Sequence, residues 1–327
     1  MRIHRSILFN YTIGLFILPC LLLCYGYYYY VSPGPLETQK NVLLPRGSKF
    51  EKVADILGEQ GVVRYPLLFK ASAVLTGNAR KFKAGEYEFL AGVSPQAVIQ
   101  ALAEGKVVIH KLTVAEGLTS EEILELLRKT ELLEGDLPQH MDEGILLPET
   151  YHYSYGDQRR ELLSRMEKSM EETLKTLWAK RDTSLPLQDM KEAVTLASVV
   201  EKETGVKDER GRVAAVFYNR LRLGMKLQSD PTTAYAITQG KGRLDRPLTR
   251  ADLGINSPYN TYVADGLPPG PIANPGKASL KAVLNPPKTD DLFFVATGNG
   301  GHNFSKSLKD HNRYVTEYRK ALKKQQP

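Results

Sequence analysis

The feature that most constrains this chain is an uncharged, apolar stretch near its N-terminus. Residues 7–31 contain no Asp, Glu, Lys or Arg. Such a stretch exceeds the ~20 residues that an α-helix needs to cross the core of a bilayer. Arg2, His4 and Arg5 precede it, so the positive-inside rule places the N-terminus in the cytoplasm. We therefore expect a single-pass anchor in the plasma (inner) membrane, with the rest of the chain outside the cytoplasm. The alternative is a cleaved signal peptide, which the length of the apolar stretch disfavours.

The cysteines and the overall charge exclude several classes of function. Both cysteines, Cys20 and Cys24, lie inside the apolar stretch, so the part after residue 31 has no thiol for a disulfide or a metal site. The 44 Lys and Arg residues outnumber the 37 Asp and Glu residues, but they are dispersed along the chain. Because there is no basic block to follow a nucleic-acid backbone, we expect no nucleic-acid partner. An anionic polymer or a membrane surface fits this charge better.

A weak pattern recurs three times after the apolar stretch. Each copy has a glycine turn, a Ser or Thr suited to cap a helix, and apolar residues at helical spacing. The copies and their expected N-caps are residues 44–63 with Ser48, 90–108 with Ser94, and 114–130 with Thr119. The pattern predicts short strands packed on small helices. It resembles LysM-like modules, which bind the N-acetylglucosamine units of peptidoglycan or chitin; a spacer without sugar affinity fits the pattern equally well.

A glutamate at the end of an apolar helix is the main candidate for chemistry. On a helical wheel, Glu203 lies ~70° from the centre of the apolar stripe, and Glu201 lies ~90° away on the other flank. Burial and the negative end of the helix dipole would both raise the pKa of such a carboxyl. It could then stay protonated near neutral pH and act as a general acid. The alternative is a structural glutamate paired with a nearby Lys or Arg.

Other site types are poorly supported by the sequence. The chain has no HExxH, CxxC, GxxxxGK[ST] or GxSxG motif. His302 follows a glycine turn, and we expect it to make a structural hydrogen bond. Glycosidases generally use two carboxylates. The carboxylates that could partner Glu203 are Glu201, Asp208, Glu209 and Asp230. Asp230 is the best placed of these, although Asp-Pro is equally common at a turn or a helix start.

Four segments carry a specific resemblance to a known family. They are LASVVEKET (196–204), VFYNRLRLGMKLQSDPTTAY (216–235), SPYNTYVADGLPPGPIANPG (257–276) and FFVATGNGGHNFSKSLKDHN (293–312). These resemble the signature blocks of the endolytic murein transglycosylases, membrane-anchored enzymes that cut the glycan strands of peptidoglycan. The family motif places its one catalytic acid/base, a glutamate at a helix end, directly before a threonine. In this chain that position is Glu203, followed by Thr204.

The resemblance also implies a mechanism without a cofactor or a metal. A protonated Glu203 would donate to the glycosidic oxygen between N-acetylmuramic acid (MurNAc) and N-acetylglucosamine (GlcNAc). The resulting carboxylate would accept the proton of the muramic C6 hydroxyl, which closes on C1 as a 1,6-anhydro end, so the enzyme is a lyase. Peptidoglycan synthases (penicillin-binding proteins) are implied partners. The implied substrate-binding residues are Gln228, Asp230, Tyr235, Tyr259, Asn260 and Tyr262.

Two other functions stay open at this stage. One is a hydrolytic muramidase in which Glu203 works with Asp230, and the other is a peptidoglycan-binding scaffold without catalysis. For the fold we expect an α+β protein with a transmembrane helix, a small LysM-like β-α module and an α+β catalytic domain. The expected boundaries are 1–31 for the cytoplasmic tip and anchor, 32–39 for a linker, 40–112 for the LysM-like module and 113–327 for the catalytic domain.

Overall fold

The structure is a computed structural model that describes residues 2–298 and 300–325, with side chains for 17–298 and 300–322. Two compact units make up the chain. The N-terminal unit contains the chain up to His110 together with His152–Asp157, and the C-terminal unit contains Lys111–Tyr151 and the chain from Gln158 onward. Both units combine helices with short strands, which confirms the predicted α+β class.

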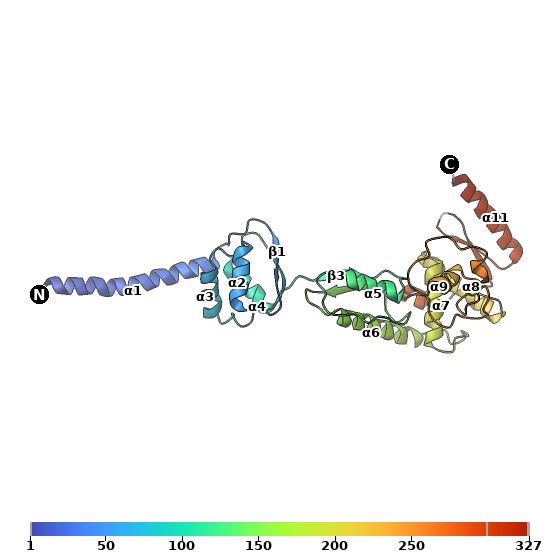
Figure 1. Ribbon diagram of the computed structural model, residues 1–327, viewed down its shortest axis with the longest axis horizontal. Helices are drawn as coiled ribbons and strands as arrows, with labels where there is room; N and C mark the ends of the chain where they lie inside the picture. The colour runs from blue at the N-terminus through green and yellow to red at the C-terminus, as the bar shows by residue number, and fades with distance from the viewer. Residues whose placement is uncertain (1, 299, 326–327) are drawn as a thin grey trace. The chain divides into compact units, whose positions relative to one another are not determined.

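The N-terminal unit begins with helix α1 (Arg2–Val31), drawn in blue in Figure 1. Over the side chains that the structure describes, no helix is both long and apolar enough to cross a membrane. The anchor predicted at 7–31 falls partly on residues 7–16, whose side chains lie outside that description, and it stays a prediction. Near the end of α1, the Tyr29 hydroxyl donates to the Tyr65 carbonyl at 3.2 Å.

A two-stranded sheet and three helices enclose the core of the N-terminal unit. Strand β1 (Lys40–Leu44) pairs antiparallel with β2 (Gly85–Phe89), with Val42 opposite Tyr87. Alternate residues of both strands are buried, as expected for a sheet with one covered face. The helices are α2 (Phe50–Glu59), α3 (Pro66–Leu75) and α4 (Pro95–Glu104).

The helix starts in this unit agree only partly with the repeat pattern. Ser94 caps α4 as predicted, accepting a hydrogen bond from the Ala97 amide at 3.2 Å. The prediction that Ser48 caps α2 is wrong, because the cap residue is Lys49. Ser48 instead belongs to the preceding turn, where its amide donates to the Pro45 carbonyl at 3.2 Å. Helix α3, which the pattern does not predict, buries Phe69 in the core.

The segment expected to be a linker, residues 32–39, packs against this unit. Leu36 belongs to the buried core, and its carbonyl accepts from the Gly92 amide at 2.7 Å. The Gly34 amide donates to the Val93 carbonyl at 3.1 Å. A Cβ at Gly34 would lie 2.3 Å from that carbonyl oxygen, so this close approach requires glycine. The segment is therefore a fixed part of the N-terminal unit.

The C-terminal unit is mainly helical, and its β5 (Phe293–Ala296) pairs antiparallel with β6 (His302–Ser305). Strand β3 (His110–Thr113) pairs with β4 (Thr150–Tyr153), and the boundary between the two units passes through both strands. The helices of the C-terminal unit are α5 (Ser120–Lys129), α6 (Arg159–Trp178), α7 (Met190–Glu203), α8 (Arg210–Arg222), α9 (Asp230–Thr238), α10 (Lys277–Leu284) and α11 (Leu308–Gln325), with short 3₁₀ turns η1 (Lys207–Glu209) and η2 (Asp252–Gly254).

Helix α7 forms the centre of this unit. Every residue from 193 to 200 is buried, so the helix is surrounded by protein on all sides. It packs against α8 and α10. Asp189 fixes its start by accepting from the Glu192 amide at 2.9 Å, and the helix ends at Glu203. The buried helix thus holds Glu203 in one position.

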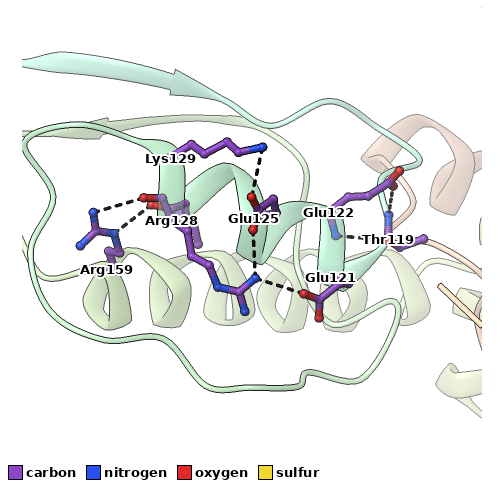
Figure 2. Close-up of polar contacts among 8 residues, drawn as sticks. Thr119, Glu121, Glu122, Glu125, Arg128, Lys129 and Arg159 are labelled. Atoms are coloured by element: carbon purple, nitrogen blue, oxygen red, sulfur yellow. Dashed lines mark hydrogen bonds and ion pairs between the residues drawn. The ribbon is translucent and has the colours of Figure 1, made fainter. Parts of the chain in front are cut away.

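Helix α5 is fixed at both ends, as Figure 2 shows. Thr119 and Glu122 form a capping box: the Glu122 carboxylate accepts from the Thr119 amide at 2.9 Å, and the Thr119 hydroxyl accepts from the Glu122 amide at 3.3 Å. The predicted Thr119 cap is therefore confirmed. At the other end Arg159 of α6 donates to the Leu127 carbonyl at 2.9 Å, which satisfies a free carbonyl of the last turn.

Candidate active site

Glu203 lies at the last residue of α7, and its side chain is half-buried. The Ser229 hydroxyl donates a hydrogen bond to Glu203 Oε1 at 2.5 Å. Ser229 is itself buried and held in place: its amide donates to Thr261 Oγ1 at 3.0 Å, and its carbonyl accepts from the Thr232 hydroxyl at 2.7 Å. The carboxyl of Glu203 is therefore oriented by a serine whose backbone is fixed by two hydrogen bonds.

The surroundings of Glu203 favour its protonated form. Burial raises the pKa of Glu203 to about 7 from an ordinary value of 4.5. The hydrogen bond from Ser229 lowers this pKa, the charge of Asp230 raises it, and the charge of Arg220 lowers it. A carboxyl with a pKa near neutrality can both give and accept a proton, as a group that acts first as acid and then as base must do.

Glu201, two residues earlier, has a different environment. Its carboxyl is almost completely buried and accepts from the Arg210 guanidinium at 3.0 Å and from the Gly276 amide at 2.9 Å. Arg210 also donates to the Glu116 carboxylate at 3.1 Å. Both oxygens of Glu201 are thus used to join α7 to α8 and to the start of α10. Its contacts are those of a structural glutamate, whereas the Ser229 hydroxyl occupies one oxygen of Glu203.

Three predicted binding residues lie around the same end of α7. Asp230 begins α9, is exposed, and accepts from the Tyr262 hydroxyl at 2.6 Å. Burial raises the pKa of Tyr262 above its ordinary value, and the Asp230 carboxylate raises it further. Gln228 is exposed in a left-handed conformation (φ 51°) directly before Ser229. These side chains lie near Glu203 and can offer both donors and acceptors to a polar ligand.

The other carboxylates considered as partners lie in different surroundings. The Glu209 carboxylate accepts from the His302 amide at 2.9 Å and contacts His302 Nδ1 at 2.7 Å. These bonds attach β6 to the turn η1, so His302 makes the structural hydrogen bond expected of it. Asp208 is exposed on the same turn. Across the described residues, no group of three or more His, Cys, Asp or Glu side chains could hold a metal ion.

Asn260 is buried and supports the loop that carries Tyr259 and Tyr262. Its Oδ1 accepts from the Thr233 hydroxyl at 2.9 Å and from the Tyr262 amide at 3.1 Å. Its Nδ2 donates to the carbonyls of Leu253 and Ile255 at 3.1 and 2.9 Å. All four hydrogen-bonding capacities of the amide are used inside the protein, so Asn260 shapes the site without facing a ligand.

Tyr235 and Tyr259 lie together in a cavity whose lining does not include Glu203. Their ring centroids are 4.9 Å apart, and both line a pocket that also contains Glu143. Burial raises the pKa of Glu143 to about 7, close to that of Glu203. Apart from the buried Asn260, the residues predicted to bind substrate therefore form two groups: Gln228, Asp230 and Tyr262 beside Glu203, and the two tyrosines beside Glu143.

Ser229, Arg220 and Glu143 do not stand out as site residues in the sequence. Ser229 stands between Gln228 and Asp230, so its place in that motif was a usable signal. Arg220 is buried, and its guanidinium donates to the carbonyls of Leu292 and Leu227 at 2.7 and 2.9 Å. No local sequence pattern marks Arg220 or Glu143 as a site residue, because the groups that contact their side chains come from segments distant in the chain.

Replacing Glu203 by glutamine should stabilise the fold at neutral and alkaline pH. The folded protein keeps the proton of Glu203 up to about pH 7, whereas an ordinary glutamate loses it near pH 4.5. Stability therefore declines as the pH rises through this window, because only the unfolded state has lost the proton. Above pH 7 the variant should exceed the wild type by up to about 3 kcal/mol. Denaturant unfolding of both full-length proteins at several pH values measures this, and equal stability at pH 8 would contradict it.

Comparison with known proteins places this site in a family. Residues 42–317 match the profile of the YceG-like family. A protein of Bacillus subtilis (strain 168) named endolytic murein transglycosylase is 34% identical in an alignment that covers 86% of this chain and 85% of the relative. A protein of the same name from Streptococcus pneumoniae (serotype 2, strain D39) is 28% identical in an alignment that covers 94% of this chain and 65% of the relative.

A solved structure agrees with the sequence comparison. The crystal structure of a YceG-like protein from Listeria monocytogenes is similar with a TM-score of 0.54 and 29% identity, covering 84% of this chain and 98% of that one. The family profile spans both units, including the end of α7 and the loop of Tyr259 and Tyr262. The resemblance carried by the four sequence segments is thereby confirmed, and this chain belongs to the YceG-like family.

Proposed function

We propose that this protein is a peptidoglycan lytic transglycosylase that cuts glycan strands endolytically between MurNAc and GlcNAc, with Glu203 as its acid/base. The observation that carries this proposal is the carboxyl of Glu203, which is oriented by Ser229 and has a pKa raised to about 7. The shared name of the curated relatives, endolytic murein transglycosylase, supports the substrate and the reaction class.

The geometry suggests which oxygen of Glu203 carries the proton. Oε1 accepts the Ser229 hydroxyl, so in the acid form the proton belongs on Oε2. Oε2 then donates to the glycosidic oxygen as the bond to C1 of MurNAc breaks. The carboxylate next takes the proton of the muramic C6 hydroxyl, whose oxygen bonds to C1. No water is consumed, and Glu203 ends the cycle protonated, as it began.

Asp230, Tyr262 and Gln228 are proposed to bind the sugars beside the scissile bond. Asp230 and Gln228 are exposed, and carboxylates and amides pair well with sugar hydroxyls. Asp230 has a second effect, because its charge raises the pKa of Glu203 and so keeps the acid protonated. In the alternative mechanism, hydrolysis, Asp230 would activate a water molecule instead.

The products of digestion distinguish these mechanisms. We expect the full-length protein to release fragments from purified peptidoglycan whose muramic ends are one water lighter than reducing ends. Mass spectrometry of the fragments measures this directly. Reducing ends would instead indicate a muramidase that uses Asp230, and the absence of fragments would favour a binding scaffold.

The setting of the reaction is part of the proposal. We propose that residues 7–31 anchor the protein in the plasma (inner) membrane, with a cytoplasmic N-terminus, and that it acts on nascent strands beside peptidoglycan synthases. We also propose that the N-terminal unit is a LysM-like module that touches the glycan. The support is the uncharged stretch, the preceding basic residues and the repeat pattern. The full-length chain should sediment with membranes, whereas residues 32–327 should not; equal behaviour of the two would refute the anchor.

A further inference from the structure

A cavity in the C-terminal unit is lined by residues other than Glu203 and the side chains beside it. Its volume is about 850 Å³, and residues of α6, α7 and α9 line it together with the loops around residues 140–145 and 269–271. Tyr235 of α9 and Tyr259 form one wall, with their rings inclined at 47° to each other. Two inclined aromatic rings form a corner that attracts a cation, because the faces of the rings carry negative potential.

Carboxylates dominate the charged groups of this cavity. Four of them line it, namely Asp142, Glu143, Glu167 and Glu171. The cationic side chains in the lining are Lys191 and, when protonated, His140. Glu171 is also paired with Lys175 on the outer side of α6. Even without Glu143, whose pKa is raised, and Glu171, which is paired, two carboxylates remain against Lys191. The cavity thus carries a net negative charge, which would favour a positively charged ligand.

Glu143 is partly buried, and two neighbouring segments fix the position of its carboxyl. Its Oε2 accepts from the Ser120 amide at 2.9 Å, directly after the capping box of α5 shown in Figure 2. Its Oε1 lies beside Gly240: a Cβ added to Gly240 would lie 2.8 Å from this oxygen. Burial raises the pKa of Glu143 to about 7. A cation bound beside the carboxyl would lower this pKa again and favour the ionised carboxylate. The group is positioned to receive a positive charge.

The remaining lining is apolar. Met170 and Leu174 of α6 and Val194 of α7 lie along the cavity. Apolar side chains of this kind favour contact with methylene groups, while the carboxyls and tyrosines receive a charged end. A flexible aliphatic chain that ends in an ammonium group matches both features.

We propose that this cavity binds the free side-chain ammonium of a diamino acid in an uncross-linked stem peptide of the glycan strand. This inference rests on the proposed function, because it assumes peptidoglycan as the substrate. Cross-linking converts the amine to a neutral amide, which loses the attraction of the carboxyls and the aromatic corner. The cavity therefore allows the protein to distinguish uncross-linked strands from cross-linked ones.

The position of the cavity suits this role. Helix α9 carries Asp230 at its first residue, beside Glu203, and Tyr235 in the wall of the cavity. Five residues along a helix correspond to a rise of about 7.5 Å. A peptide attached to a muramic residue near the cleaved bond could therefore follow α9 into the cavity.

Binding to an inactive protein tests the inference separately from turnover. Labelled, uncross-linked glycan chains with lysine-containing stem peptides are compared with the same chains after N-acetylation of their amines. For the full-length Glu203→Gln variant, we expect acetylation to weaken binding about tenfold in fluorescence anisotropy. Adding Glu143→Gln or Glu167→Gln should bring the two dissociation constants close together. In Glu143→Gln the new amide oxygen could still accept from the Ser120 amide, so the fold should be retained.

A neighbouring residue provides the matched control. Glu172→Gln removes the same charge from α6 at an exposed position outside the cavity lining, and the tenfold preference should persist in it. The inference would be overturned if the Glu203→Gln variant bound both kinds of chain equally or bound neither. It would also be overturned if the preference for unacetylated chains persisted in both Glu143→Gln and Glu167→Gln. Cleavage of peptide-free glycan by the wild type is measured in parallel. Its failure would refute the proposed function, whereas equal binding would refute the ammonium site alone.

Discussion

The Glu203→Gln variant should lose glycan cleavage almost completely while remaining folded. Glutamine can still accept the hydrogen bond from Ser229, but it has no proton to donate and cannot act as a base. Because one group would serve as both acid and base, we expect turnover to fall by about 10³-fold or more. The release of fragments from purified peptidoglycan, followed with time by chromatography, measures the loss.

Asp208 offers a matched control for this variant. It is an exposed carboxylate in the turn that follows α7, and it lies in neither of the two groups of site residues. Asp208→Asn removes one negative charge close by in the chain and should retain turnover. Wild-type activity in Glu203→Gln would refute the assigned role of Glu203, and an equal loss in Asp208→Asn would show that the change of charge alone is responsible.

The Arg210→Met variant should lose about 3–5 kcal/mol of stability. The guanidinium of Arg210 and the carboxylate of Glu201 are both nearly inaccessible, with 6% and 4% of their side chains exposed. Removing the arginine leaves the Glu201 charge buried, with the Gly276 amide as its remaining hydrogen-bond donor among the described residues. We expect the melting temperature of the full-length protein to fall by roughly 10 °C, measured by thermal unfolding.

Two further variants show whether the buried charge is the cause. Arg210→Met combined with Glu201→Gln should regain part of the stability, because the uncompensated charge is gone. Arg128 of α5 contacts Glu121 and Glu125 at the surface, as Figure 2 shows, with 39% of its side chain exposed. Arg128→Met should therefore cost less than about 1 kcal/mol. A loss as small as this for Arg210→Met, or no recovery in the double variant, would contradict the interpretation.

Local patterns predicted part of the helical structure. Helix α6 (Arg159–Trp178) carries apolar residues four apart, at Leu162, Met166, Met170 and Leu174, a spacing that indicates a helix. The caps Ser94 and Thr119 were found from side-chain chemistry alone, because a cap bonds to an amide only three residues away. Helix α3 and the true start of α2 were missed, since a turn at Ser48 and packing of Phe69 in the core decide them.

The division of the binding residues into two groups could not be predicted from sequence. In the segments that resemble the family, the predicted binding residues lie close together in the chain; they include Asp230, Tyr235, Tyr259, Asn260 and Tyr262. Along α9, however, Asp230 and Tyr235 lie at different sites, and Asn260 turns inward to hold the loop. The direction of each side chain depends on segments that meet only in the folded chain. Tertiary contacts therefore separate residues that the motif presents as one set.

By itself, the sequence determined the α+β class, the helix caps at Ser94 and Thr119 and the candidate glutamate, because periodicity, capping and a long motif act over short distances. The tertiary structure decided how the two glutamates at the end of α7 differ. Arg210 and the Gly276 amide bind Glu201 tightly, whereas Ser229 orients Glu203 and burial raises its pKa to about 7. Two carboxyls of the same type, two residues apart, acquire different properties because different distant segments surround them, and desolvation and charge pairing depend on those surroundings.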